Sequence, residues 1–154
     1  TVAYIKMCRA RKIAGHSSNE LAGISEYLLK NKKGQILLVK DTDQVVLGGM
    51  FLAYQGISVR YLLGAADPDK RDLPILHLAI YEAIANAKKE GFRYFDFWGY
   101  NHFAKPNDQV YFLNHFKKGF GGYFTFFAKK MNINLFPYGY KMYRVLVKIK
   151  KLGR

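Results

Sequence analysis

Residues 73–99 read LPILHLAIYEAIANAKKEGFRYFDFWG, and this stretch predicts a helix followed by a strand. Its apolar residues recur at helical spacing as far as Lys89, and Asp72 stands where an N-cap is expected. Gly91 then supplies a residue that commonly ends helices. The run Tyr94–Trp98 is apolar except for one carboxylate, which indicates a mostly buried strand.

Three further strands are predicted upstream of this helix. They are Gln35–Lys40, Val45–Gln55 and Ile57–Leu63, and short polar or glycine turns separate them, as in an antiparallel meander. Gly48 and Gly49 lie inside the second strand, where glycine indicates a bulge or a close approach of another backbone. A meander followed by a helix and a strand predicts an α/β fold whose mixed sheet has antiparallel and parallel neighbours.

The N-terminal side adds one extended segment and one helix. Residues 2–14 form a basic run that we expect to be extended. Ser17 or Ser18 then caps a predicted amphipathic helix that reaches about Asn31. Cys8 is the one cysteine, which excludes an intramolecular disulfide, and no base stands beside it in the sequence to make it a nucleophile.

The C-terminal side is strongly basic. We predict a short helix at Val110–Lys118, an aromatic strand at Tyr123–Ala128 and a basic amphipathic helix from Tyr138 to Arg154. The net charge is +14, and the residues after Asp108 hold ten Lys or Arg and no acid. Such a one-sided field favours a polyanionic partner, either RNA phosphates or an anionic membrane surface, although a solvated basic surface is the plain alternative.

Three motifs, together with the basic C-terminal extension after the last predicted strand, resemble one known family. They are GGMFLAYQGISVRYLLGAAD at 48–67, the Pro–helix–Gly–Phe-Asp-x-x-Gly pattern at 73–99, and FLNHFKKGFGG at 112–122. Together they resemble the GNAT superfamily, and within it the C-terminal half of the Fem-type (FemAB-like) peptidoglycan-bridge aminoacyltransferases. The resemblance implies a GNAT-like acyltransferase fold with a central meander and a splayed parallel strand pair.

The resemblance also implies a domain organisation and a cellular place. It implies one GNAT-like domain over residues 1–154, with a core at about 16–128 and a basic extension at 129–154, as one half of a two-half protein. A cytoplasmic location is expected, with peripheral contact at the inner face of the membrane.

The donor is predicted from the absence of a phosphate-binding loop between the third strand and the following helix. CoA-dependent members usually carry a glycine-rich phosphate loop before the helix, and Gly64–Pro74 has no such pattern. Fem-type proteins use aminoacyl-tRNA, so the resemblance implies transfer of an aminoacyl group to an amine of a peptidoglycan precursor on a nucleotide or lipid carrier. It implies no bound cofactor. Two alternatives stay open: a CoA-dependent N-acyltransferase, and a non-catalytic basic module that binds RNA or anionic membrane.

Two residues are candidates for chemistry. Lys117 is the lysine of the Fem pattern, which implies that it faces the reaction centre, where an ammonium stabilises an oxyanion or holds a phosphate. The alternative is a surface lysine in a basic run. Asp96 is a carboxylate in an apolar strand, and it either accepts a proton from the attacking amine or fixes a neighbouring loop.

The expected substrate-binding residues surround the ends of the third and fourth strands. Because side chains alternate along a strand, at most one of two consecutive residues at 60 and 61 points into the cleft. The histidines lack the spacing of a metal site, and no metal is expected. The substrate-binding set is Arg60, Tyr61, Gly64, Gly99, Tyr100, Asn101 and Phe116.

Overall fold

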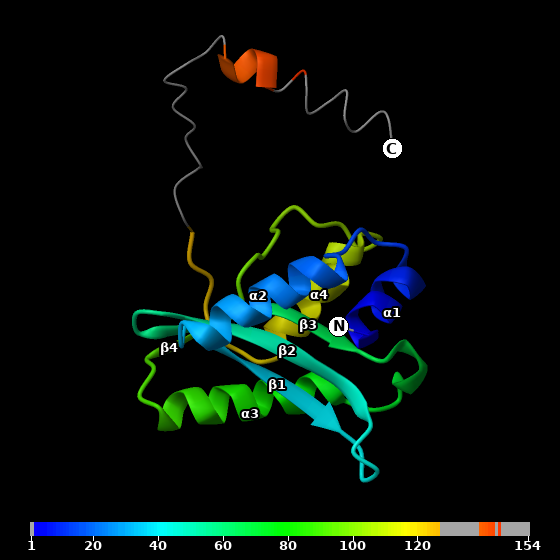
Figure 1. Cartoon of the computed structure of the whole chain (residues 1–154), viewed down its shortest axis with the longest axis vertical. Coiled ribbons are helices and arrows are strands. Elements are labelled where there is room, and N and C mark those ends of the chain that lie inside the picture. The colour runs from blue at the N-terminus through cyan, green and yellow to red at the C-terminus, as the bar shows by residue number, and fades with distance from the viewer. Residues whose placement is uncertain (1, 127–138, 144, 146–154) are drawn as a thin grey trace. The chain divides into compact units, whose positions relative to one another are not determined.

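The computed structural model describes residues 2–126, 139–143 and 145. The chain divides into two units, Thr1–Gly119 and Phe120–Arg154, and each is described by itself. The single domain expected over residues 1–154 therefore stays a prediction. All helices and strands named below belong to the first unit (Figure 1).

The first unit is built on a four-stranded mixed sheet in the order β1-β2-β3-β4. The strands are β1 (Gly34–Lys40), β2 (Val46–Gln55), β3 (Ser58–Ala66) and β4 (Tyr94–Asp96). β1 and β3 each pair with β2 antiparallel, while β3 and β4 run parallel. The predicted meander and the mixed sheet are confirmed, although β4 is shorter than the predicted strand, which extended to residue 98.

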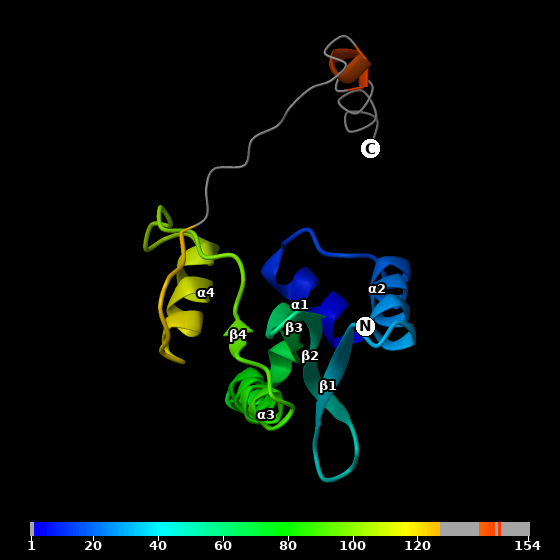
Figure 2. The same ribbon diagram turned by 90° about the vertical axis from the view of Figure 1, so that its left-hand side faces the viewer.

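Helices cover both faces of this sheet. Figure 2 shows α1 and α2 on one face and α3 on the other, with α4 on the side of β4. None of the helices within the described ranges has the length and apolar character needed to cross a bilayer. The helices are α1 (Val2–Arg11), α2 (Ser18–Lys30), the 3-10 turn η1 (Pro68–Lys70), α3 (Ile75–Lys89) and α4 (Gln109–Lys118).

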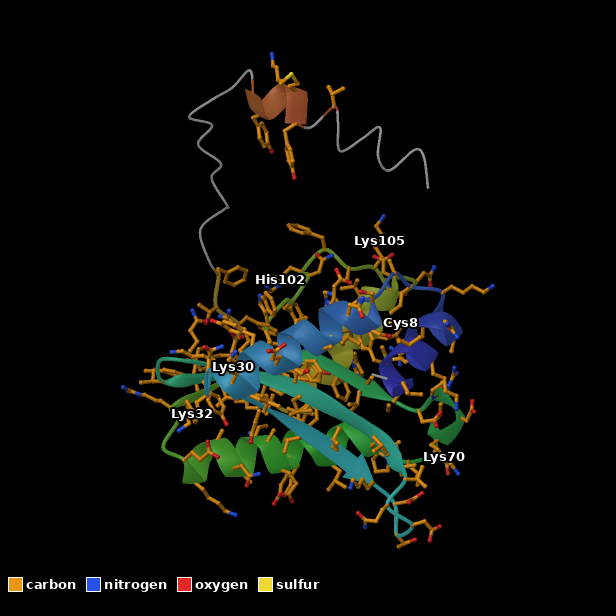
Figure 3. All side chains as sticks on the ribbon, viewed as in Figure 1. Cys8, Lys30, Lys32, Lys70, His102 and Lys105 are labelled. Atoms are coloured by element: carbon orange, nitrogen blue, oxygen red, sulfur yellow. The ribbon has the colours of Figure 1, made fainter. Side chains whose placement is uncertain are left out.

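The prediction of an extended N-terminal segment is wrong, because residues 2–11 form α1. Met7 and Cys8 are buried on this helix and cluster with Ala65 of β3, and Tyr4 packs against them. Figure 3 shows Cys8 on α1. The helix is weakly patterned in sequence, so its form follows from this tertiary packing and not from an apolar stripe.

α2 is capped by Ser17, one of the two predicted caps, and the structure adds a capping box. The Ser17 hydroxyl accepts from the Glu20 amide at 3.3 Å, and the Glu20 carboxylate accepts from the Ser17 amide at 2.7 Å. These two bonds satisfy donors that helix geometry leaves unpaired. Leu21 and Leu28 are buried beneath the helix, which anchors it on the sheet.

The N-cap of α3 lies two residues after the predicted one. Pro74 occupies the N-cap position and no side chain caps the helix there, so the prediction for Asp72 is wrong. The C-terminal prediction is confirmed, since Gly91 follows the helix with φ +82°. The buried face of α3 consists of Ile75, Ala79, Ile80, Ala83 and Ala87.

The two glycines of β2 allow neighbouring backbones to come close. A Cβ at Gly48 would lie 2.6 Å from the Ala65 carbonyl oxygen, and one at Gly49 would collide with the Leu37 carbonyl. The β1–β2 register also shifts beside Gly48, between Val39 and the next residue. The predicted close approach is therefore confirmed.

The predicted strand at Tyr123–Ala128 is wrong where it can be judged, since residues 123–126 are not in a strand and 127–128 lie outside the described residues. Aromatic content alone suggested that strand. Of the predicted basic helix at 138–154, residues 139–143 and 145 are helical, and the rest of that helix lies outside the described residues.

Candidate functional site

The sheet opens where β3 and β4 separate. Their parallel register ends at the pair Arg60–Asp96, while β3 continues to Ala66. The chain leaves β4 through two successive left-handed residues, Trp98 with φ +46° and Gly99 with φ +47°. The predicted splayed pair is confirmed. A bulky residue seldom adopts a positive φ, so its surroundings must hold this turn in place.

Lys117 is one of the groups that hold the turn. Its Nζ donates to the carbonyl oxygens of Trp98 at 2.5 Å and Gly99 at 2.8 Å. Burial lowers the pKa of the Lys117 ammonium, and the nearby Asp96 carboxylate opposes this shift. The ammonium is therefore partly buried and directed at the turn that follows β4. Two of its three N–H groups serve the turn, and the third makes no hydrogen bond to any residue that the structure describes.

Asp96 holds the same turn from the other side. One carboxylate oxygen accepts from the Trp98 amide at 2.8 Å, and the other accepts from Arg60 Nε at 3.0 Å. The Arg60 guanidinium also lies over the Trp98 ring, 5.3 Å from its centroid. Both oxygens are thus used inside the protein, which favours the loop-fixing alternative for Asp96. Its role as a proton acceptor stays a prediction.

Tyr61 and Gly64 form a packing pair. Tyr61 is 7% exposed, and its ring lies 6.5 Å from that of Phe97. A Cβ at Gly64 would collide with the Tyr61 hydroxyl, so this glycine makes room for the phenol. Burial raises the pKa of Tyr61 to about 12, which keeps it neutral. Arg60, its neighbour in the chain, points instead to Asp96, as alternation along a strand requires.

Asn114 connects the loop after β4 to α4, and the sequence analysis missed it. Its side chain is buried, accepts from the Asn101 amide at 3.3 Å and donates to the Asn101 carbonyl at 2.7 Å. The Asn101 side chain in turn accepts from the Phe103 amide at 3.0 Å. The available signal was a lone amide among the apolar residues of a short helix.

A small polar pocket lies beside this connection, with a volume of about 210 Å³. Figure 3 labels His102 and Lys105 on the loop between β4 and α4. Phe116 packs edge-on against His77 at 4.9 Å and thereby joins α4 to α3. Among the described residues, no group of three or more acids, histidines or cysteines could hold a metal ion. The pocket is lined by Tyr100, Asn101, His102, Ala104, Tyr111, Asn114, His115 and Lys118.

A larger apolar pocket of about 470 Å³ lies between α1 and the strands β1 to β3. Two charged residues line it, and they pair with each other, since Lys6 Nζ lies 2.8 Å from the Asp67 carboxylate. The ammonium also lies 2.8 Å from Asp69. This pocket includes Gly64 of β3, but no residue of β4 or α4 lines it, and we place the candidate site at the opening between β3 and β4.

Solved structures share this fold. A probable acetyltransferase aligns with TM-score 0.59 at 12% identity, over 85% of this chain and 87% of its own. The PaiA N-acetyltransferase of Thermoplasma acidophilum, solved in complex with coenzyme A, aligns with TM-score 0.53 at 15% identity, over 76% and 78%. The fold is therefore that of the GNAT acyltransferases, as the resemblance implied.

The sequence places the chain more narrowly. Residues 14–148 match the model of the FemAB family, and the chain belongs to that family. A Lipid II:glycine glycyltransferase of Staphylococcus haemolyticus is 27% identical over 114 residues, which cover 74% of this chain and 26% of that protein. The chain thus spans about a quarter of the length of this relative.

Proposed function

We propose that this chain takes part in acyl transfer to an amine, and that the group transferred is an aminoacyl group carried by aminoacyl-tRNA. The observation that carries the proposal is the position of Lys117, whose ammonium lies at the separation of β3 and β4 and is directed inward. A cation placed there has one N–H group left for a developing negative charge.

The chemistry would proceed through a tetrahedral intermediate. An acceptor amine attacks the ester carbonyl carbon, the carbonyl oxygen becomes an oxyanion, and Lys117 donates to it. The intermediate then collapses with cleavage of the ester C–O bond, the ribose oxygen takes up a proton, and the amine nitrogen loses one. Alignment of the two reactants supplies part of the rate acceleration and oxyanion stabilisation another part.

The connection between β3 and α3 supports a donor other than CoA. An N-terminal helix turn binds pyrophosphate through free backbone N–H groups, with glycines that allow close approach. Here the connection has no such glycine pattern, and Pro74, which has no N–H, occupies the N-cap of α3.

The acceptor is proposed from the relative. Because the similar protein of Staphylococcus haemolyticus is named a Lipid II:glycine glycyltransferase, we propose a peptidoglycan precursor on a nucleotide or lipid carrier as the amine substrate. Such a precursor would bring the protein to the inner face of the membrane from the cytoplasm. The net charge of +14 supports contact with tRNA or with anionic lipid.

The test compares two adjacent lysines in the complete protein. Lys117→Ala removes the inward ammonium, and Lys118→Ala removes an exposed one with the same change in net charge. With charged tRNA and precursor, we expect Lys117→Ala to lower kcat by roughly 10²–10³ and Lys118→Ala to leave it nearly unchanged. Equal turnover in both variants would remove Lys117 from the mechanism. Tight calorimetric binding of acetyl-CoA would instead support the CoA-dependent alternative.

A further inference from the structure

Trp98 is held firmly and yet exposed. It is the one tryptophan in the sequence, and 54% of its surface is accessible. Its amide donates to Asp96, its carbonyl accepts from Lys117, and its ring lies against the Arg60 guanidinium. Each polar group of its backbone is therefore used in the turn, while much of the ring is left to solvent.

Packing in the apolar core does not explain why Trp98 is held in this position, and neither does the ordinary occurrence of exposed aromatic residues. A tryptophan that is more than half exposed gains little from burial, and its positive φ of +46° costs conformational energy. Single exposed aromatics are normal on protein surfaces, but they are not usually fixed by a carboxylate, an ammonium and a guanidinium together. A ring fixed in this way is suited to stack on a flat ligand, since little side-chain freedom remains to be lost on binding.

The neighbouring cations indicate which flat ligand fits. The two cations Arg60 and Lys117 and the carboxylate of Asp96 leave one net positive charge beside this residue, which suits a ligand with negative charge as well as a planar ring. A nucleotide has both features, and bases stack readily on tryptophan. A neutral sugar ring offers an apolar face for stacking but no negative charge.

The distance between the adenine and the reactive carbonyl then distinguishes the two possible nucleotide donors. In aminoacyl-tRNA, one ribose separates the adenine of the terminal adenosine from the reactive ester. In an acyl-CoA, a pyrophosphate and a long pantetheine arm separate the adenine from the thioester. Because Lys117 Nζ donates to the backbone carbonyl of Trp98, the ring and the ammonium belong to the same turn, which fits the short spacing in aminoacyl-tRNA better than the long one in acyl-CoA.

We infer that Trp98 stacks on the adenine of the 3′-terminal adenosine of the tRNA donor and thereby sets its ester beside Lys117. The inference rests on the proposed function, because it assigns a binding residue for the donor of that reaction. Arg60 and Asp96 act as positioning residues for the ring.

The first experiment uses the fluorescence of the 154-residue chain, in which Trp98 is the one tryptophan. The chain is titrated with a short RNA that ends in 3′-CCA and with the same RNA whose terminal ribose carries no base. Both RNAs have the same number of phosphates, so their general electrostatic attraction is equal. We expect saturable quenching with the CCA end and a Kd roughly 5- to 150-fold weaker with the abasic end.

The second experiment uses variants and the anisotropy of labelled RNA. Trp98→Leu should abolish the preference for the CCA end, and Trp98→Phe should keep part of it. The control is Tyr27→Leu, which removes an exposed aromatic residue elsewhere, on α2, and this variant should keep the whole preference for the CCA end. If circular dichroism shows that Trp98→Leu is unfolded, the comparison of the two RNAs on the unchanged chain still tests the inference.

Three outcomes would overturn the inference: equal quenching by both RNAs, quenching by CoA but by neither RNA, or quenching by an N-acetylglucosamine oligosaccharide but by neither RNA. The second outcome assigns the ring to CoA, and the third to a sugar of the acceptor. All three outcomes are read from binding, so they do not require aminoacyl transfer to be observed. If the unchanged chain shows no RNA preference but the complete protein transfers the aminoacyl group, the role of Trp98 alone is refuted. If the unchanged chain shows a clear RNA preference but no transfer occurs, the reaction alone is refuted.

Discussion

At the scale of single residues, the contrast between Lys117 and Lys118 shows how one position acquires a role that its neighbour lacks. Both lie in the last turn of α4, where a cation also interacts favourably with the helix dipole. Lys118 is exposed, while Lys117 is partly buried and donates to two carbonyl oxygens of the turn after β4. The motif therefore marks a lysine whose environment differs from that of an ordinary basic surface.

The protonation of Lys117 should reflect this environment. Burial lowers its pKa, so its titration by NMR of ¹³C-labelled, unmodified lysines should fall below 10.5. Between the folded and the unfolded pKa the unfolded chain binds more protons, so this residue makes stability rise with pH through that window. Asp96→Asn removes the opposing attraction and should lower the pKa of Lys117 further. A titration at or above 10.5 would contradict the burial seen here.

Substitutions at Asp96 separate its two candidate roles. Asp96→Asn keeps an oxygen for the Trp98 amide but loses the charge of the partly exposed pair with Arg60, which should cost about 1 kcal/mol or less. Asp96→Ala loses both contacts and should cost roughly 1–2 kcal/mol more in urea unfolding. Turnover of Asp96→Asn near the unsubstituted value is expected for a positioning residue. A drop of more than a hundredfold in that variant alone would make Asp96 the proton acceptor.

The crowding between Gly64 and Tyr61 gives a steric prediction. Gly64→Ala inserts a methyl group against the phenol and should cost about 1–3 kcal/mol. In a Tyr61→Leu background the same change should cost less, since the obstructing atoms are gone. Gly23→Ala is the matched control, because a Cβ there meets nothing within 4 Å on α2, and it should stabilise the chain by up to about 1 kcal/mol. Equal effects of Gly64→Ala in both backgrounds would refute the packing.

At the scale of elements, Asn114 determines how α4 meets the loop that leaves β4. Asn114→Ala leaves the Asn101 amide and carbonyl without their partner and should cost about 1–3 kcal/mol. Hydrogen exchange at the Asn101 amide should accelerate more than exchange in the middle of α4. Leu113→Ala, at an exposed neighbouring position, should alter neither measurement much. Unchanged protection of Asn101 would show that the loop is held by other contacts.

The elements also show what sequence can and cannot predict. The meander and α2 were predictable because alternation, turn residues and the Ser17–Glu20 capping box are local signals. α1 was not, because its burial depends on contact with Ala65, which is distant in the chain. The start of α3 was misplaced because Asp72 has cap chemistry, whereas the helix begins only after Pro74.

The candidate site was partly predictable for a similar reason. The residues at 60, 96, 99 and 117 follow from motifs and do meet at the opening of the sheet. Asn101 and Phe116 were expected to bind substrate, but their visible contacts support the loop and the helix packing. Trp98 was counted only as a strand residue. Its positive φ and its ion contacts are tertiary facts that no spacing reveals.

At the scale of the whole molecule, charge is distributed unevenly along the sequence. The first 108 residues hold fifteen basic and eleven acidic groups, and the remainder holds ten basic groups and no acid. If the C-terminal residues contact RNA phosphates, each contact releases counterions and steepens the dependence of binding on salt. A solvated basic surface would add no such contacts. The logarithmic slope of RNA affinity against salt therefore distinguishes a specific contact from general attraction.

Two double charge reversals, which lower the net charge by the same amount, make this distinction. Lys129→Glu with Lys130→Glu changes the C-terminal part, and Lys32→Glu with Lys33→Glu changes the chain after α2 by the same total charge. We expect the first pair to reduce the slope by up to about two and the second to leave it nearly unchanged. Trp98→Leu should weaken binding at every salt concentration without changing the slope, because stacking releases no counterions. Equal reduction by both charge reversals would mean that RNA responds only to net charge, and the basic C-terminal part would then have no specific role in binding the donor.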